Sequence, residues 1–441
     1  MAAESIDYLP LHIRVRSSRW FTIASVAIAV FTDTFLYGHA PHSQVILTAV
    51  AVGLSGAGNL VGSYHIRNRR TSLLLGLTVF IAGTAMIWAA RHFAILSIGR
   101  LLQGLASAAV WVVGLALLAD TVGRDEVPVA MGYVNVGFSG GTVLGPIAGG
   151  LLYSLGGFDA VMGLAVGLLC LDILLRILII EKKDLPSFLS TAAVKGSLFD
   201  QEASSPLLRE SVPSYTTCAE RPAVCNGSGG EDNITSAVPE IALRILIQSR
   251  RLLVSLGCTL VQAITMTAFE VTLPLHLYET PGYTMLDTGL VFIPIMVPAL
   301  LSPVIGHICT RLGNRPVVLT GYLVCGTMLI LLRLHTSSDT VHDMGLHVAL
   351  AFIGLAMCMV MTPVLSEVFA AVEDLEREKP GRFGAYGAFA QAYGLFELFY
   401  AAGSLLGPVL AGWLKTQFSW ASMTLGLGAL NLITIAVVLL L

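Results

Sequence analysis

The sequence predicts an all-α integral membrane protein with twelve transmembrane helices in two pseudo-symmetric six-helix bundles. Three observations carry this prediction. Hydrophobic residues make up 55% of the 441 residues and charged residues only 12%, too few to cover a water-exposed surface. Apolar stretches of membrane-spanning length recur twelve times, and one glycine–proline pattern occurs in both halves of the chain. Duplication of this kind is the usual plan of secondary transporters.

A helix of about 20 apolar residues crosses the hydrocarbon core of a bilayer. Six such stretches come before residue 181 and six follow residue 250. The first set lies at 19–38, 43–63, 71–90, 93–120, 128–154 and 158–180, and the second at 251–275, 284–310, 315–334, 344–372, 384–412 and 417–441. We therefore expect an N-terminal bundle over 19–180 and a C-terminal bundle over 251–441.

Two segments fall outside the bundles. Residues 1–18 carry Arg14 and Arg16 before the first apolar stretch, which has no cleavage site and is read as a retained span. Residues 181–250 are rich in Ser, Thr, Pro, Gly and charge, which predicts a flexible linker.

The distribution of positive charge predicts the orientation. If the N-terminus is cytosolic, most of the 25 Lys and Arg lie on the cytosolic side, and the opposite side keeps Arg91, Arg333 and Lys415. Both termini and the linker are then cytosolic, so Asn226 and Asn233 in the linker are chance glycosylation triplets. The same orientation holds in the plasma membrane and in a vacuolar or vesicular membrane.

The repeated pattern has small residues at every fourth position and a proline among them. Its two copies contain Gly141, Gly145, Pro146, Gly149 and Gly150, and Gly403, Gly407, Pro408, Ala411 and Gly412. Small residues at this spacing let two helices approach backbone to backbone, and proline permits a bend. We expect both copies to seal and bend the bundles.

Ionisable residues within spans cost roughly 2.5–3.5 kcal/mol each on insertion scales, so each calls for a role. Asp33 lies near the middle of the first span and could hold a proton in one state and a cation in another. The plainer alternative is a carboxyl satisfied by neighbouring hydroxyls. Glu270 and Glu397 occupy the seventh and eleventh spans and could face a central cavity.

The other buried charges have less distinctive roles. Arg100 must pair within the fourth span and could tune a nearby proton carrier. Asp172 and Arg176 are one helical turn apart and are expected to neutralise each other. Glu367 is expected to be structural, with a gate as the alternative. Four aromatic residues could stack on an organic cation, namely Phe35, Tyr37, Trp111 and Tyr393. Packing between helices is the commoner role of such residues.

Several function classes are excluded. No nucleophile–base pair, metal-ligand set or phosphate-binding loop stands out, so the chain is not an enzyme and needs no metal or cofactor. The net charge of −3 says nothing about nucleic acid, but the chain has no basic domain, so no nucleic-acid partner is expected. The expected partners are a small organic substrate and the lipid bilayer, and the expected state is a monomer.

With these residues in place, the chain resembles the major facilitator superfamily along nearly its whole length. Within it, the match is to the twelve-span drug:proton antiporters, on the branch with the vesicular amine transporters. The segment 99–104 (Gly-Arg-Leu-Leu-Gln-Gly) resembles the motif in span 4 of these antiporters, and the segment 141–150 resembles the motif in their span 5. The segment 31–38 is similar to their first span, in which an aspartate is tied to amine recognition. The stretch 384–396 resembles fungal members.

The resemblance implies the major facilitator fold and proton-coupled export of a small, amphipathic or cationic organic compound. Asp33 would be the main proton or cation site, Glu270 and Glu397 auxiliary acids, and Arg100 a residue that tunes proton transfer. The coupling ion is the proton. The alternatives are a facilitator or metabolite importer of the same fold, and a transport-inactive homologue.

The chain departs from the family in the motif that latches the cytoplasmic gate. Its two copies here consist of Gly62, Arg67 and Arg70, and of Gly306, Arg311, Gly313 and Arg315. Ile66 and Thr310 stand where the family has aspartates, so the latch is weak or rebuilt. The link after the first span, 39–42, is also short, and Cys358 stands nearest to an aspartate of the amine carriers.

Overall fold

The computed structural model describes residues 18–37, 69–178, 238–279, 290–333, 344–380, 382–383 and 388–439. All regular structure within these ranges is helical, and no strand occurs in them, which confirms the all-α prediction. Nine helical segments of the described residues are long and apolar enough to cross a membrane. The chain is a multi-pass membrane protein.

The N-terminal half consists of α2 (Arg19–Tyr37), α4 (Arg69–Trp88), α5 (Phe93–Thr121), η2 (Arg124–Glu126) and α6 (Val127–Leu178). Each α-helix covers an apolar stretch of the sequence, and α6 covers two. The predicted span at 43–63, with Gly62 and Arg67, lies outside the described residues, as does the side chain of Arg70.

The two spans within α6 are separated at Gly157. Its φ of 67° and ψ of −161° lie outside the helical region, in backbone space that glycine adopts at little cost. The helix before Gly157 and the helix after it match the predicted spans at 128–154 and 158–180.

The C-terminal half begins with α8 and is helical to its end. Its elements are α8 (Val238–Gln248), α9 (Arg250–Glu279), α11 (Ile293–Met296), η3 (Val297–Leu301), α12 (Ser302–Leu312), α13 (Asn314–Leu332), α14 (Met344–Glu378), α15 (Phe389–Gln417) and α16 (Trp420–Val438). The eighth span is divided among α11, η3 and α12, because Pro294, Pro298 and Pro303 each lack the N–H that a continuous α-helix needs.

Helix α8 lies inside the range that the sequence predicted as linker. Ala242 and Leu246, one turn apart, are buried, which gives α8 an apolar face in the core, and α8 packs against α9. The polar residues that surround this short segment dominate its composition and hide the periodicity.

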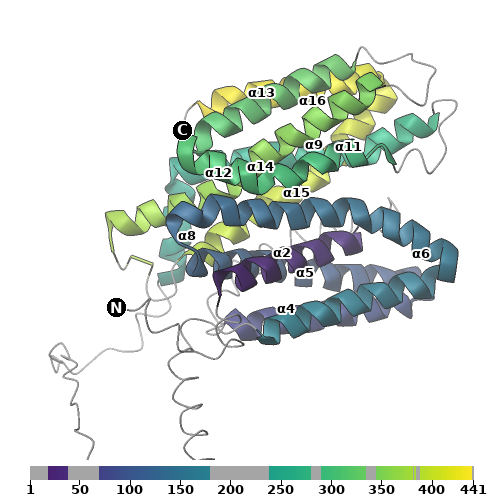
Figure 1. Cartoon of the computed structure of the whole chain (residues 1–441), viewed down its shortest axis with the longest axis horizontal. Coiled ribbons are helices and arrows are strands. Elements are labelled where there is room, and N and C mark those ends of the chain that lie inside the picture. Colours follow the sequence, from purple (N-terminus) through teal and green to yellow (C-terminus); the bar gives the residue numbers. More distant parts are fainter. Residues whose placement is uncertain are drawn as a thin grey trace, which may run out of the picture.

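The two halves lie side by side, with the C-terminal helices above the N-terminal ones in Figure 1. Helix α6 runs along the boundary and packs against α12, while α5 packs against α15. The Nδ2 of Asn135 on α6 donates to the Oγ of Ser302 on α12 at 2.8 Å. This bond crosses between the halves.

The second copy of the glycine–proline pattern lies where α15 meets α9. A Cβ on Gly403 would lie 2.6 Å from the carbonyl oxygen of Leu260, and one on Gly407 would lie 2.6 Å from that of Ile264. The expected close approach is confirmed for this copy. In the first copy Gly141, Gly145 and Gly149 are buried in α6, and the side-chain surroundings of Pro146 and Gly150 lie outside the described residues.

Candidate functional site

Asp33 occupies the interior of the N-terminal half, with 1% of its surface exposed. Its Oδ2 accepts hydrogen bonds from the Oγ of Ser107 at 2.8 Å and from the Nε1 of Trp111 at 2.9 Å. Both donors lie on α5, four residues apart, and so project from one face of that helix toward α2. Two donors hold one oxygen of the carboxyl in place.

The other oxygen of Asp33 is different. Its Oδ1 is buried and has no hydrogen-bond partner among the described residues. An unsatisfied buried acceptor is costly in the folded state, so such groups are uncommon unless they serve a purpose. This oxygen is available to a proton or to a cationic ligand.

A row of aromatic rings leads from Asp33 to the other half of the molecule. The ring of Trp111 meets that of Phe138 edge-on with centroids 5.6 Å apart, and Phe138 meets Tyr400 in the same way at 6.1 Å. These residues lie on α5, α6 and α15, so the row crosses the boundary between the halves. Trp111 was among the aromatic candidates from sequence, whereas Phe138 and Tyr400 were missed.

The acids predicted from the second half lie near this row. Glu397 on α15 is 4% exposed, and Glu270 on α9 is partly buried. Glu397 precedes Tyr400 by three residues on α15, and the hydroxyl of Tyr400 donates to the Sδ of Met266 at 3.8 Å, one turn before Glu270 on α9. Three carboxyl groups from three spans and both halves are thus gathered in one region.

Arg100 lies further along α5 and is 5% exposed. Its Nη1 donates to the Oε1 of Gln103 at 3.0 Å, and the Nε2 of Gln103 donates to the Oγ1 of Thr84 on α4 at 2.8 Å. Arg100 precedes Ser107 by two helical turns, or about 10 Å along the axis. The hydrogen bonds from Arg100 through Gln103 to Thr84 therefore join α5 to α4 about two helical turns from the residues that hold Asp33.

The contacts of two other sets of candidates indicate a role in stabilising the fold. The Nε of Arg176 lies 3.5 Å from the Oδ1 of Asp172, and both side chains are buried, which confirms the expected pairing. The hydroxyl of Tyr393 donates to the carbonyl oxygen of Leu365 at 3.2 Å in a fully buried position. The side chains of Phe35 and Tyr37 lie outside the described residues.

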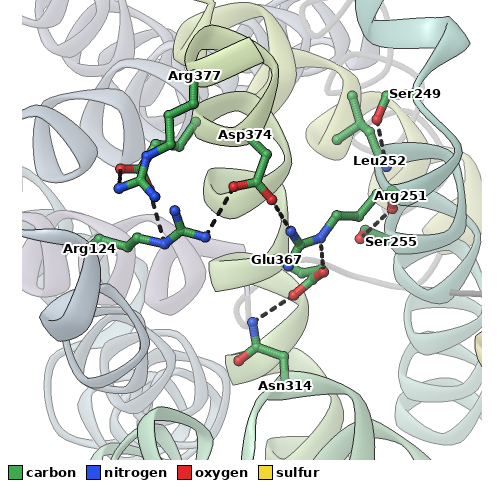
Figure 2. A network of polar contacts seen from close by, with 10 residues as sticks. Arg124, Ser249, Arg251, Leu252, Ser255, Asn314, Glu367, Asp374 and Arg377 are labelled. Atoms are coloured by element: carbon green, nitrogen blue, oxygen red, sulfur yellow. Dashed lines mark hydrogen bonds and ion pairs between the residues drawn. The ribbon is translucent and has the colours of Figure 1, made fainter.

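The second copy of the gate motif surrounds the turn between α12 and α13. Gly313 adopts a φ of 85° at this turn, and Gly306 lies in α12. Arg311 is exposed, and the Nη2 of Arg315 donates to the carbonyl oxygen of Leu439 at 2.6 Å. Nearby, Glu367 belongs to a network of polar contacts that the sequence did not predict (Figure 2).

A cavity of about 760 Å³ opens beside this network and is lined by both halves. Its walls include Arg124 and Pro128 from the N-terminal half and Arg251, Asn314 and Glu367 from the C-terminal half. Within the described ranges no three His, Cys, Asp or Glu side chains gather in a way that could hold a metal ion.

Comparison with known proteins agrees with this architecture. The profile of the Major Facilitator Superfamily matches residues 17–391. The uncharacterized MFS-type transporter C18.02 of Schizosaccharomyces pombe is 28% identical over 435 residues, or 93% of each chain. The multidrug resistance protein Stp of Mycobacterium tuberculosis is 26% identical over 89% of this chain and 73% of its own. The vesicular acetylcholine transporter of Rattus norvegicus is 26% identical over 90% of this chain and 64% of its own.

The fold has a counterpart among solved structures. The crystal structure of the human organic anion transporter MFSD10 (TETRAN) covers 95% of this chain and 99% of its own, with a TM-score of 0.64 and 17% identity. The family profile spans most of both halves and the relatives extend over nearly the whole chain. The chain belongs to the Major Facilitator Superfamily.

Proposed function

We propose that this transporter is a proton-coupled antiporter that exports a small, amphipathic or cationic organic compound by alternating access. The observation that carries the proposal is Asp33, a buried carboxyl with one oxygen held by Ser107 and Trp111 and the other open. A buried ionisable group in a membrane span is costly, and its commonest justification is a role in moving ions or substrate.

The mechanism follows from competition at the open oxygen. When Asp33 is protonated, its charge is removed and a cationic compound has no counter-ion at this carboxyl. When the proton leaves toward one side, the carboxylate can pair with the compound. A proton and a substrate that exclude each other at one site are exchanged across the membrane when that site alternates between the two sides.

The surroundings of Asp33 suit an organic cation. The rings of Trp111, Phe138 and Tyr400 offer apolar surface and aromatic faces, which attract cations. Glu270 and Glu397 add negative charge from the opposite half. Arg100 is one level away, where its permanent charge tunes proton transfer along α5.

The relatives favour a small organic substrate. One is named a multidrug resistance protein and another an acetylcholine transporter. We further propose that the protein acts as a monomer without a bound cofactor, in the plasma membrane or in a vacuolar or vesicular membrane, with both termini cytosolic.

The test uses the purified full-length chain in liposomes with an imposed pH gradient. Lipophilic cations and amines are added in turn, and substrate-induced proton flux is followed with a trapped pH-sensitive dye. We expect at least one compound to drive flux in the parental protein and none to do so in Asp33→Asn, because an amide can neither release a proton nor balance a cation.

Asp159→Asn is the matched control. Its Oδ1 also accepts a hydrogen bond from a tryptophan, the Nε1 of Trp88 at 2.8 Å, but this bond is exposed. Flux should survive this change. Parental flux in Asp33→Asn would overturn the assignment of Asp33, and substrate uptake without proton movement would favour a facilitator.

A further inference from the structure

The two halves are joined by charged side chains at one end of the molecule. This end, here called the linker side, is where α5 and α14 end and where α9 and α13 begin, and it is cytosolic in the proposed orientation. Arg124, just beyond α5, reaches across to α14. Its Nη2 donates to the Oδ1 of Asp374 at 3.0 Å, and its Nε lies 3.4 Å from the Oε2 of Glu373.

Asp374 connects this contact to a second arginine. Its Oδ2 accepts from the Nη1 of Arg251, in the first turn of α9, and the Nε of Arg251 donates to the Oε1 of Glu367. The Oε2 of Glu367 accepts from the Nδ2 of Asn314 at 2.7 Å. Figure 2 shows the resulting relay, which runs from Arg124 through Asp374, Arg251 and Glu367 to Asn314.

Local structure fixes the members of the relay. Glu367 and Asp374 are seven residues apart, so both carboxylates project from one face of α14. The carbonyl oxygen of Arg251 accepts from the Oγ of Ser255 at 3.0 Å, and the Oγ of Ser249 accepts from the backbone N–H of Leu252 at 3.4 Å. The first turn of α9 therefore holds Arg251 toward α14.

The relay adjoins a tight backbone contact between the halves. A Cβ on Gly132 would lie 2.5 Å from the carbonyl oxygen of Ser302, and one on Gly306 would lie 2.3 Å from that of Pro128. The halves are thus in direct contact on the linker side, and Arg124 is the charged group of the N-terminal half in the relay.

The relay has the properties of a contact that must break in every cycle. Its side chains are only partly buried, with 35% of Arg124, 38% of Arg251 and 39% of Asp374 exposed. Ion pairs at such positions contribute modestly, because water screens them and replaces them when they part. The loop motif that serves as a latch in the family lacks its acids here, at Ile66 and Thr310.

We propose that this relay is the gate that holds the linker side closed, and that Arg124 with Asp374 carries the function of the latch that the loop motifs have lost. The proposal rests on alternating access, but it requires neither proton coupling nor a particular substrate. Opening of the linker side separates Arg124 from α14 and leaves Arg251, Glu367 and Asn314 together within the C-terminal half.

The test measures the distance between the halves in the full-length protein in lipid nanodiscs. Spin labels are attached to Gly123→Cys and Leu312→Cys, after replacement of the exposed Cys170 and of Cys218 and Cys225 by serine. A Cβ on Gly123 would have no atom within 4 Å, and Leu312 is 67% exposed, so both positions accept a label. Distances are read by pulsed electron paramagnetic resonance.

We expect Arg124→Ala to raise the long-distance population roughly two- to fivefold, a shift within the range of one partly exposed ion pair. Asp374→Asn should act in the same direction, and the double variant should add little to the larger single effect. Arg124→Lys, which keeps the charge, should restore most of the closed population. Each variant should still show the distance peaks of the parental protein, in changed proportions, and the same tryptophan emission, which would show that it is folded.

Arg19→Ala is the matched control. Arg19 pairs with Glu126 at 2.5 Å, but both residues belong to the N-terminal half. An unchanged distance distribution in Arg124→Ala, or an equal shift in Arg19→Ala, would overturn the gate. The measurement needs no substrate or pH gradient, so a protein without proton coupling could still confirm the gate, and a coupled protein could still refute it.

Discussion

At the scale of single residues, the surroundings of a carboxyl decide what it can do. Asp33 and Asp159 each accept a hydrogen bond from a tryptophan indole, at 2.9 and 2.8 Å. Asp159 can exchange its partner for water, whereas Asp33 is enclosed and keeps an unsatisfied oxygen among the described residues. The same pair of side chains is therefore a surface contact in one place and a candidate coupling site in the other.

The hydrogen bond from Trp111 can be tested apart from its ring. Trp111→Phe keeps an aromatic ring against Phe138 but removes the N–H that Asp33 accepts. We expect the free energy of unfolding to fall by about 1.5–3 kcal/mol, the range for a hydrogen bond to a charged group. Thermal denaturation in detergent measures the change, and proton flux should fall with it.

Trp88→Phe provides the comparison for Trp111→Phe. It removes the same kind of bond at an exposed site, where water replaces the indole. Its melting temperature should stay close to that of the parent. An equal fall in melting temperature in both variants would mean that the hydrogen bond to Asp33 stabilises the protein no more than the exposed bond does.

Part of the site was accessible from sequence. Asp33, Glu270 and Glu397 stand out because each is an acid within an apolar stretch. Ser107 does not, since a serine or threonine in a membrane helix usually bonds its own backbone, as Thr34 does with the carbonyl oxygen of Val30. Tyr400 does not, because an aromatic residue in a membrane helix usually packs against its neighbours. Their relation to the acids depends on how α5 and α15 are rotated, which one sequence does not determine.

At the scale of elements, the glycine–proline pattern yields a clean contrast within α15. A Cβ on Gly407 would lie 2.3 Å from the Oγ1 of Thr267, whereas one on Gly412 would meet nothing within 4 Å. We expect Gly407→Ala to destabilise the protein by about 1–3 kcal/mol through overpacking. Gly412→Ala should be neutral or stabilising by up to ~1 kcal/mol, because alanine favours the helix. Thermal denaturation of the two variants shows whether a glycine of this pattern is needed for a close helix contact or is simply a small residue in a membrane helix.

Most helices could be predicted because their apolar stretches match the bilayer, but their interruptions could not. The break at Gly157 is an exception, because it lies inside the predicted gap between the spans at 128–154 and 158–180. In contrast, α8 is hidden in a polar segment, and η3 breaks a stretch that reads as one span. The formation of α8 depends on packing against its neighbours, as the burial of Leu246 shows, whereas the break at η3 follows from prolines that the sequence does contain.

At the scale of the whole molecule, the central acids and the relay lie at different levels of the same boundary. Asp33 and Glu397 belong to opposite halves and lie near the two ends of the aromatic row of Trp111, Phe138 and Tyr400, while Arg124 and Asp374 meet at the linker side. Motion that parts α6 from α12 would change access to the acids without disturbing the contacts of Asp33 with α5. This arrangement agrees with the proposed alternating access, in which the two halves rock as rigid bodies about the site.

The relay could not have been predicted from the spacing of charges. Arg124 and Asp374 are 250 positions apart, and each reads as an ordinary solvated residue at the end of a helix. Only the packing of the two halves brings them together. The missing acids at 66 and 310 indicated that the latch had changed, without indicating where its replacement lies.

The close contact between α6 and α12 gives a last prediction, about the balance between closed and open states. Gly132→Ala would bring a methyl group within 2.5 Å of the carbonyl oxygen of Ser302, and Gly306→Ala one within 2.3 Å of that of Pro128. Backbone cannot yield as a flexible side chain does, so the halves must separate on the linker side. We expect either variant to raise the long-distance population between labels at 123 and 312.

Gly407→Ala separates this effect from a general loss of stability. It crowds α15 against α9 inside the C-terminal half, where the contact does not lie between the halves. It should therefore lower the melting temperature without changing the distance between the labels. If Gly132→Ala and Gly306→Ala lowered the melting temperature but left that distance unchanged, the contact between α6 and α12 would be a fixed seam, and the linker side would have to open elsewhere.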